Sequence, residues 1–83
     1  MLRELKNVEA GEHATYFRFS KMPVAKTRCL ANGEINVDLD ADNEVVGIEV
    51  LSLDPEEMQT LADVVKEYRL SLSQLTHALK PSA

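Results

Sequence analysis

The chain has 83 residues, a formal net charge of −5 and a hydrophobic content of 45%. This length predicts one small domain that buries on the order of 60% of its unfolded surface, and the acidic charge opposes unspecific nucleic-acid binding. No apolar run approaches the roughly 20 residues of a membrane span. A single cysteine, Cys29, excludes an intramolecular disulfide and favours a reducing compartment. We therefore expect a soluble, cytoplasmic protein that binds neither nucleic acid nor a membrane.

Acidic side chains concentrate in the middle of the chain. Residues 34–57 hold nine acidic residues and no basic one, whereas residues 1–33 hold six basic and three acidic residues. Opposite charges on neighbouring strands stabilise a sheet. The separation therefore predicts that basic strands pair with acidic ones, and the acidic segment would suit a basic protein partner.

Strands are predicted first along the chain. Residues 2–8 are compatible with a strand or with an irregular lead-in. From residue 14 to residue 51 apolar and polar side chains alternate with period two, which is typical of half-buried strands. Phe17 and Phe19 alternate with Tyr16 and Arg18, and residues 35–39 and 45–51 follow the same pattern.

Turn chemistry sets the registers of the next two hairpins. Asn32-Gly33 marks the first turn. A two-residue turn would place Lys26 and Arg28 on the apolar face, so we predict a three-residue loop over residues 31–33. Lys26 then lies opposite Asp38, and the apolar face receives Ala25, Thr27 and Cys29. The second hairpin requires a four-residue loop over residues 41–44, because an odd number would turn its apolar side chains away from the core.

The period changes to that of a helix at Asp54. Asp54 can cap this helix, Pro55 suits its first position and Glu57 completes a capping box, with Leu53 and Met58 as a hydrophobic staple. The helix is predicted to end near Tyr68, and its apolar stripe consists of Met58, Leu61, Ala62, Val65 and Tyr68. A second helix is predicted from Ser71 to Pro81.

These elements predict an α+β domain. An antiparallel meander of three to four strands, residues 1–53, would carry C-terminal helices, residues 54–83, packed on one face. The second helix and the residue before it place four leucines in a short segment: Leu70, Leu72, Leu75 and Leu79. That is more apolar surface than a short helix of a small monomer needs, and it favours a homodimer.

Residues 8–53 resemble the YuzE-like family, small bacterial proteins built on a domain of unknown function. The resemblance is carried by Ala14-Tyr16-Arg18-Ser20, by Val37-Asp38-Asp40 and by the block from Val45 to Leu51. The chain has Val8-Glu9 and His13 where the family usually carries Tyr-Asp and a further Asp. The resemblance implies a small sheet-based domain, and the family has no established activity. Some members look like partners in two-gene toxin–antitoxin modules.

The segment 38–49 matches an EF-hand loop at Asp38, Asp40, Asp42 and Glu49, with Asn43 in place of the required glycine. An EF-hand also needs a helix on each side. Here strand-like alternation flanks the segment, so a hairpin turn that favours Asp and Asn is the better interpretation. We expect no metal site and no cofactor.

No pattern typical of an enzyme occurs. His13 and His77 lack a partner at metal-binding spacing, and Cys29 has the alternation of an inward, buried side chain rather than that of a nucleophile. The tail offers only Lys80 to a DNA groove. We therefore expect a protein that is not an enzyme.

The polar side of the predicted sheet remains as the candidate site. It is either a solvated face held by charge pairs or a partner-binding face, for which Tyr and Arg are favoured residue types. The predicted partner-binding residues are Tyr16, Arg18, Arg28, Asp38, Asp40 and Glu49. Two functions follow: a protein-interaction module, with an antitoxin-like role included, or a small ligand- or divalent-metal-binding domain that uses the Asp-rich turn.

Overall fold

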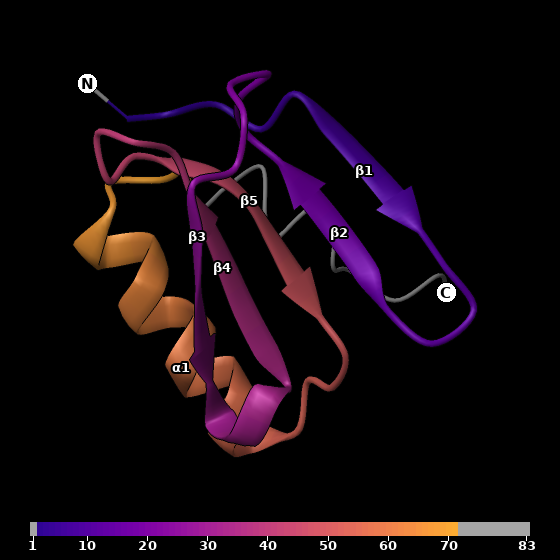
Figure 1. Ribbon diagram of the computed structural model, residues 1–83. Helices are drawn as coiled ribbons and strands as arrows, with labels where there is room; N and C mark the ends of the chain where they lie inside the picture. The colour runs from indigo at the N-terminus through magenta and orange to yellow at the C-terminus, as the bar shows by residue number, and fades with distance from the viewer. Residues whose placement is uncertain (1, 72–83) are drawn as a thin grey trace.

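The computed structural model describes residues 2–71. Five antiparallel strands form one sheet: β1 (Asn7–Ala10), β2 (Thr15–Arg18), β3 (Lys26–Leu30), β4 (Ile35–Leu39) and β5 (Val45–Val50). Their order across the sheet is β1-β2-β5-β4-β3. A short 3₁₀ turn, η1 (Ala31–Gly33), joins β3 to β4, and the helix α1 (Pro55–Glu67) lies against one side of the sheet (Figure 1).

The α+β class predicted from the sequence is confirmed, but the strand count is wrong. The segment before residue 11 forms a regular edge strand, and Val8 of β1 lies opposite Phe17 of β2. The sheet is also not a simple meander, because β2 pairs with β5. One helix is present among residues 2–71. The second predicted helix, with His77, lies outside the described residues.

The hydrophobic core lies between the sheet and α1. Phe17, Ile35, Val37 and Ile48 are completely buried, and Leu61, Val64 and Val65 of α1 join the same cluster. Because side chains alternate along a strand, these strand residues share one face, here called the apolar face. The opposite face of the same strands carries mostly polar side chains.

The helix begins and ends where the sequence predicts, but it is rotated about its axis, so that a different set of its side chains is buried. Pro55 is its first residue and Tyr68 its C-cap. Met58, predicted to be part of the buried stripe, is 49% exposed, and Ala62 is exposed, whereas Val64 and Glu57 are buried. Asp54 occupies the N-cap position without a side-chain cap bond. Glu57 accepts a hydrogen bond from the Ser52 hydroxyl at 2.7 Å, which compensates the burial of its carboxylate.

The register predicted for the first hairpin is wrong. Leu30 pairs with Ile35, so four residues form the loop, and Thr27 rather than Lys26 lies opposite Asp38. Lys26 and Arg28 therefore lie on the side of the apolar face, where the edge position of β3 leaves Lys26 exposed. Thr27 and Cys29 lie on the opposite side, and Cys29 is exposed rather than buried. The prediction failed because it treated an edge strand as if its charges would be buried.

The register predicted for the second hairpin is confirmed over most of its length. Val37 lies opposite Ile48 and Asp38 opposite Gly47. A β-bulge then shifts the pairing so that Leu39 lies opposite Val45. Bulges of this kind bend a strand at the end of a ladder, and this one leads into the turn at Asp40.

The start of the chain is attached to the segment that follows α1. The Arg3 amide donates to the Arg69 carbonyl, and the Ser71 amide donates to the Arg3 carbonyl, both at 2.8 Å. Leu70, between these bonds, is buried in the core. Among the described residues, no helix is long and apolar enough to cross a membrane.

Candidate interaction surface

All five strands contribute to the side of the sheet opposite α1. Register pairing places two rows of side chains there. We call this surface the polar face and define it by Glu9, Tyr16, Arg18, Thr27, Cys29, Asn36, Asp38, Gly47 and Glu49. These residues come from strands that are far apart in sequence, so only the completed sheet assembles the surface.

The centre of the polar face is a carboxylate held by two hydroxyl groups. Tyr16 donates to Asp38 Oδ2 at 2.7 Å, and Thr27 donates to Asp38 Oδ1 at 2.5 Å. Tyr16 and Asp38 are not on neighbouring strands, because β5 lies between β2 and β4. The Tyr16 ring spans this gap by lying over Gly47, where a Cβ would overlap its ring and hydroxyl. Gly47 is therefore the residue that allows the contact.

Arg18 extends this arrangement toward β1, at the edge of the sheet. Its guanidinium carbon lies 5.0 Å from the centroid of the Tyr16 ring, in a cation–π contact. The guanidinium also contacts Glu9 Oε2 on β1 at 3.4 Å. A continuous chain of contacts thus runs from β1 to β3 and fixes the positions of Tyr16 and Arg18.

A second set of contacts holds the side chains of Asn36 and Glu49 on the polar face. The Asn36 amide donates to Glu49 Oε1 at 3.1 Å and to the Gly33 carbonyl at 2.7 Å. Asn36 therefore joins the acidic side chain of β5 to the turn at the end of β3. Glu49 is half-buried, and its carboxylate accepts the Asn36 bond through Oε1.

The environment of Tyr16 favours its neutral form. Burial comes first, followed by the hydrogen bond to Asp38 and the negative charge of that carboxylate, and together they raise the pKa of Tyr16 well above its ordinary value of 10.0. A phenol that holds its proton so firmly serves as a hydrogen-bond donor. It does not serve as a general base or a nucleophile at neutral pH.

An absorbance titration tests this arrangement. The difference between the wild type and Tyr16→Phe isolates the Tyr16 phenolate, and we expect it to form only at a pH clearly above 10.0. Because the folded-state pKa is the raised one, the associated stability is present below pH 10 and is lost as the pH rises beyond it. Tyr16→Phe should not show this loss of stability at high pH. A Tyr16 signal that titrates near 10 would contradict the contact with Asp38.

Four of the six predicted partner-binding residues meet on this surface. Tyr16, Arg18, Asp38 and Glu49 all belong to the polar face. Arg28 does not, because it lies on the α1 side of the sheet, where it donates to Glu67 at 2.9 Å and to the Tyr68 hydroxyl.

Asp40 is also absent from the polar face, because it organises the turn between β4 and β5. It is 5% exposed, and its Oδ1 accepts the amides of Asp42 and Glu44 at 2.8 and 3.0 Å. Asn43 takes the left-handed conformation with φ 62°, which Asn tolerates better than most residues. The EF-hand match is thus a hairpin turn with internal carboxylate bonds. Residues 2–71 contain no group of three or more potential metal ligands.

Sequence reasoning missed four members of the polar face. The wrong register assigned Thr27 and Cys29 to the other face, and Glu9 lies on a strand that was only weakly indicated. Gly47 carries a usable signal, because a glycine inside an otherwise β-branched strand often marks a close approach by another group. The sequence does not indicate which side chain makes that approach.

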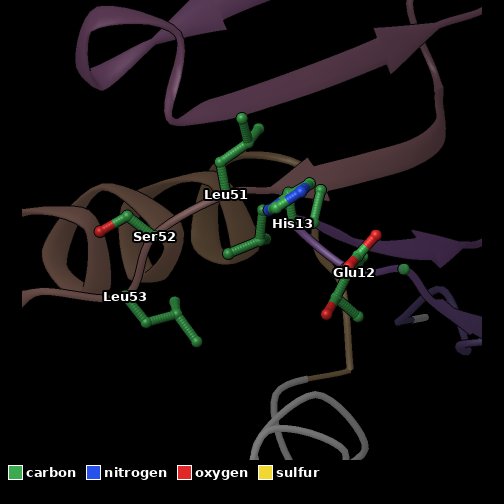
Figure 2. A pocket seen from close by; sticks show the side chains of 9 residues that line it. Glu12, His13, Leu51, Ser52 and Leu53 are labelled. Atoms are coloured by element: carbon green, nitrogen blue, oxygen red, sulfur yellow. The ribbon is translucent and has the colours of Figure 1, made fainter.

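A pocket of about 230 Å³ lies at the opposite end of the sheet from the β4–β5 turn, between the β1–β2 turn and the connection from β5 to α1. Figure 2 shows Glu12 and His13 on one side and Leu51, Ser52 and Leu53 on the other. Ser52 already donates to Glu57. His13 is an exposed turn residue.

Comparison with known proteins adds one finding. No curated protein and no solved structure matches the chain significantly. The sequence resemblance implied a domain of unknown function, and a family model of that description matches part of the chain. The narrower YuzE-like assignment stays a prediction. Residues 13–53, just under half of the chain and including β2 to β5, match the family model described as protein of unknown function (DUF2283).

Proposed function

We propose that this protein is a non-enzymatic interaction module that binds a basic protein partner through the polar face. The observation that carries the proposal is the fixed position of Tyr16 and Arg18, which are half-buried and held by the contacts with Asp38 and Glu9. Tyr and Arg are over-represented among residues that dominate binding energy. A side chain that is already ordered loses less conformational entropy when a partner binds.

Charge supports a basic partner. The polar face carries Glu9, Asp38 and Glu49 against one arginine, and the whole chain has a net charge of −5. Complementary charge steers association and selects among partners. A small basic toxin of a two-gene module is one partner of this kind, in line with the antitoxin-like role suggested by the resemblance.

The alternative function, a ligand or divalent-metal site at the Asp-rich turn, has less support. The Asp40 carboxylate is committed to two amides, and Asp38 points to Tyr16 and Thr27 on the polar face. A cation at the turn would have to replace these bonds before it could be coordinated.

Affinity capture followed by calorimetry with the recovered protein tests the proposed function. We expect Arg18→Ala and Glu49→Lys each to raise the dissociation constant about tenfold or more, because each removes or reverses a charged contact at the surface. Glu12→Lys is the control, since it makes the same charge change at an exposed turn outside the polar face. Equal affinities for the wild type and both polar-face variants would rule out this surface.

A further inference from the structure

β3 is a free edge of the sheet among the described residues. Within residues 2–71 it stands at one end of the strand order and pairs only with β4. Thr27 and Cys29 on this strand are exposed, so these described residues leave the edge uncovered there. An exposed edge strand can template pairing with another chain.

The outward backbone groups of β3 follow from the hydrogen-bond alternation. The Leu51 amide donates to the Glu34 carbonyl at 2.8 Å, which makes these two residues a bonded pair of the β4–β5 ladder. Bonded pairs alternate in antiparallel ladders, so Ile35 and Val37 direct their peptide groups toward β3. Their partners, Leu30 and Arg28, are thereby satisfied. The peptide groups of Thr27 and Cys29 point away from the sheet.

We propose that a second copy of this chain pairs with β3 in antiparallel orientation, with the two-fold axis at Arg28. In this register Thr27 of each copy lies opposite Cys29 of the other, so that all four outward residues form bonded pairs. An axis at Thr27 would place Lys26 opposite Arg28 and run into residue 25. An axis at Cys29 would extend the pairing into η1, where Ala31 and Asn32 have positive φ. Only the Arg28-centred register uses extended backbone throughout.

Charge supports a second copy as the occupant of this edge. Glu56, Asp63 and Glu67 lie on one flank of α1 by helical spacing, and the contact of Glu67 with Arg28 shows that this flank lies over β3. α1 contacts η1, and Figure 1 shows that the helix begins near this turn. Because η1 follows the last residue of β3, α1 runs opposite to β3. The flank is acidic, whereas β3 contributes Lys26 and Arg28. The edge is therefore self-complementary in charge.

The register aligns these charges. Asp63 is one helical turn, about 6 Å, from Glu67 toward η1, and Leu30 is two strand residues, about 6.6 Å, from Arg28 in the same direction. The second copy's Lys26 lies opposite Leu30 and so reaches the level of Asp63. The two Arg28 side chains meet at the axis, each already paired with its own Glu67 at 2.9 Å. Lys26, which would otherwise protect the edge from pairing, thus meets an acidic surface.

Light scattering on the full chain over a range of concentrations, with charge variants, tests the interface. We expect the wild type to dimerise and Asp63→Lys to raise the dimer dissociation constant about tenfold, because the variant places two lysines together at each contact. Lys26→Asp combined with Asp63→Lys should restore the dimer. Glu12→Lys, with the same charge change far from β3, should leave it unchanged. A monomeric wild type, or a dimer insensitive to Asp63→Lys, would overturn the proposal.

Disulfide formation tests the register. Thr27→Cys should give dimers linked between residue 27 of one copy and Cys29 of the other under mild oxidation, since opposite Cα atoms lie about 5.5 Å apart. Thr27→Cys with Cys29→Ser is the matched control and should give none, because the two introduced thiols are diagonal neighbours. Absence of the link in a dimeric Thr27→Cys variant, or efficient linkage in the control, would contradict the Arg28-centred register.

Discussion

Phe17→Ala is expected to destabilise the protein by about 3–5 kcal/mol, the range typical of Phe-to-Ala changes in a packed core. Phe17 is completely buried and lies opposite Ile48 of β5, which in turn lies opposite Val37 of β4. The change therefore leaves a cavity at the point where the β1–β2 hairpin joins the rest of the sheet. A domain of 83 residues has a total free energy of unfolding of about 4–12 kcal/mol. A large fraction of the variant molecules should therefore unfold at low denaturant concentration.

Urea unfolding followed by circular dichroism measures this effect. Val8→Ala provides the control, because Val8 lies opposite Phe17 on the same face of the sheet but is 39% exposed. We expect Val8→Ala to lower the free energy of unfolding by less than about 1 kcal/mol. Similar losses for the two variants would contradict the placement of the core between the sheet and α1.

Gly47→Ala should destabilise the protein by about 1–3 kcal/mol, although alanine is usually the better strand residue. The added Cβ would overlap the Tyr16 ring and hydroxyl, so Tyr16 must swing away and give up its bond to Asp38. A lost hydrogen bond to a charged group costs about this amount. The cation–π contact of Arg18 depends on the same ring and should be lost as well.

A double-mutant cycle separates this cause from a backbone effect. In a Tyr16→Ala background the space above Gly47 is empty, so Gly47→Ala should be neutral or stabilising by up to about 1 kcal/mol. Equal destabilisation in both backgrounds would show that the backbone at residue 47 requires glycine. The same Gly47→Ala variant should also bind the partner more weakly, because Tyr16 is displaced from the polar face.

The sequence predicts the α+β class, the helix from residue 55 to residue 67 and the register of the second hairpin, because each depends on local pattern. It fails where tertiary position decides. The register of β3 depends on its place at the edge of the sheet, where Lys26 stays exposed beside an apolar face. The pairing of β2 with β5 joins segments about 30 residues apart and leaves no local signal.

For the candidate site too, prediction succeeds where local periodicity decides and fails where tertiary position decides. Alternation correctly places Tyr16, Arg18, Asp38 and Glu49 on one face, because strand periodicity fixes their direction. It misplaces Asp40, because the bulge after Asp38 ends the alternation and turns that carboxylate into the β4–β5 turn. It misplaces Arg28 through the register error. The contact between Tyr16 and Asp38 across Gly47 requires the complete strand order and cannot be derived from periodicity.

Amide chemical-shift mapping of the labelled protein with the captured partner shows which surface of the protein the partner contacts. We predict that the largest shifts fall on Tyr16, Arg18, Asn36, Gly47 and Glu49. Amides on the exposed side of α1, such as Gln59 and Lys66, should stay unchanged. Shifts confined to α1, with the polar face unperturbed, would rule out the polar face as the binding surface.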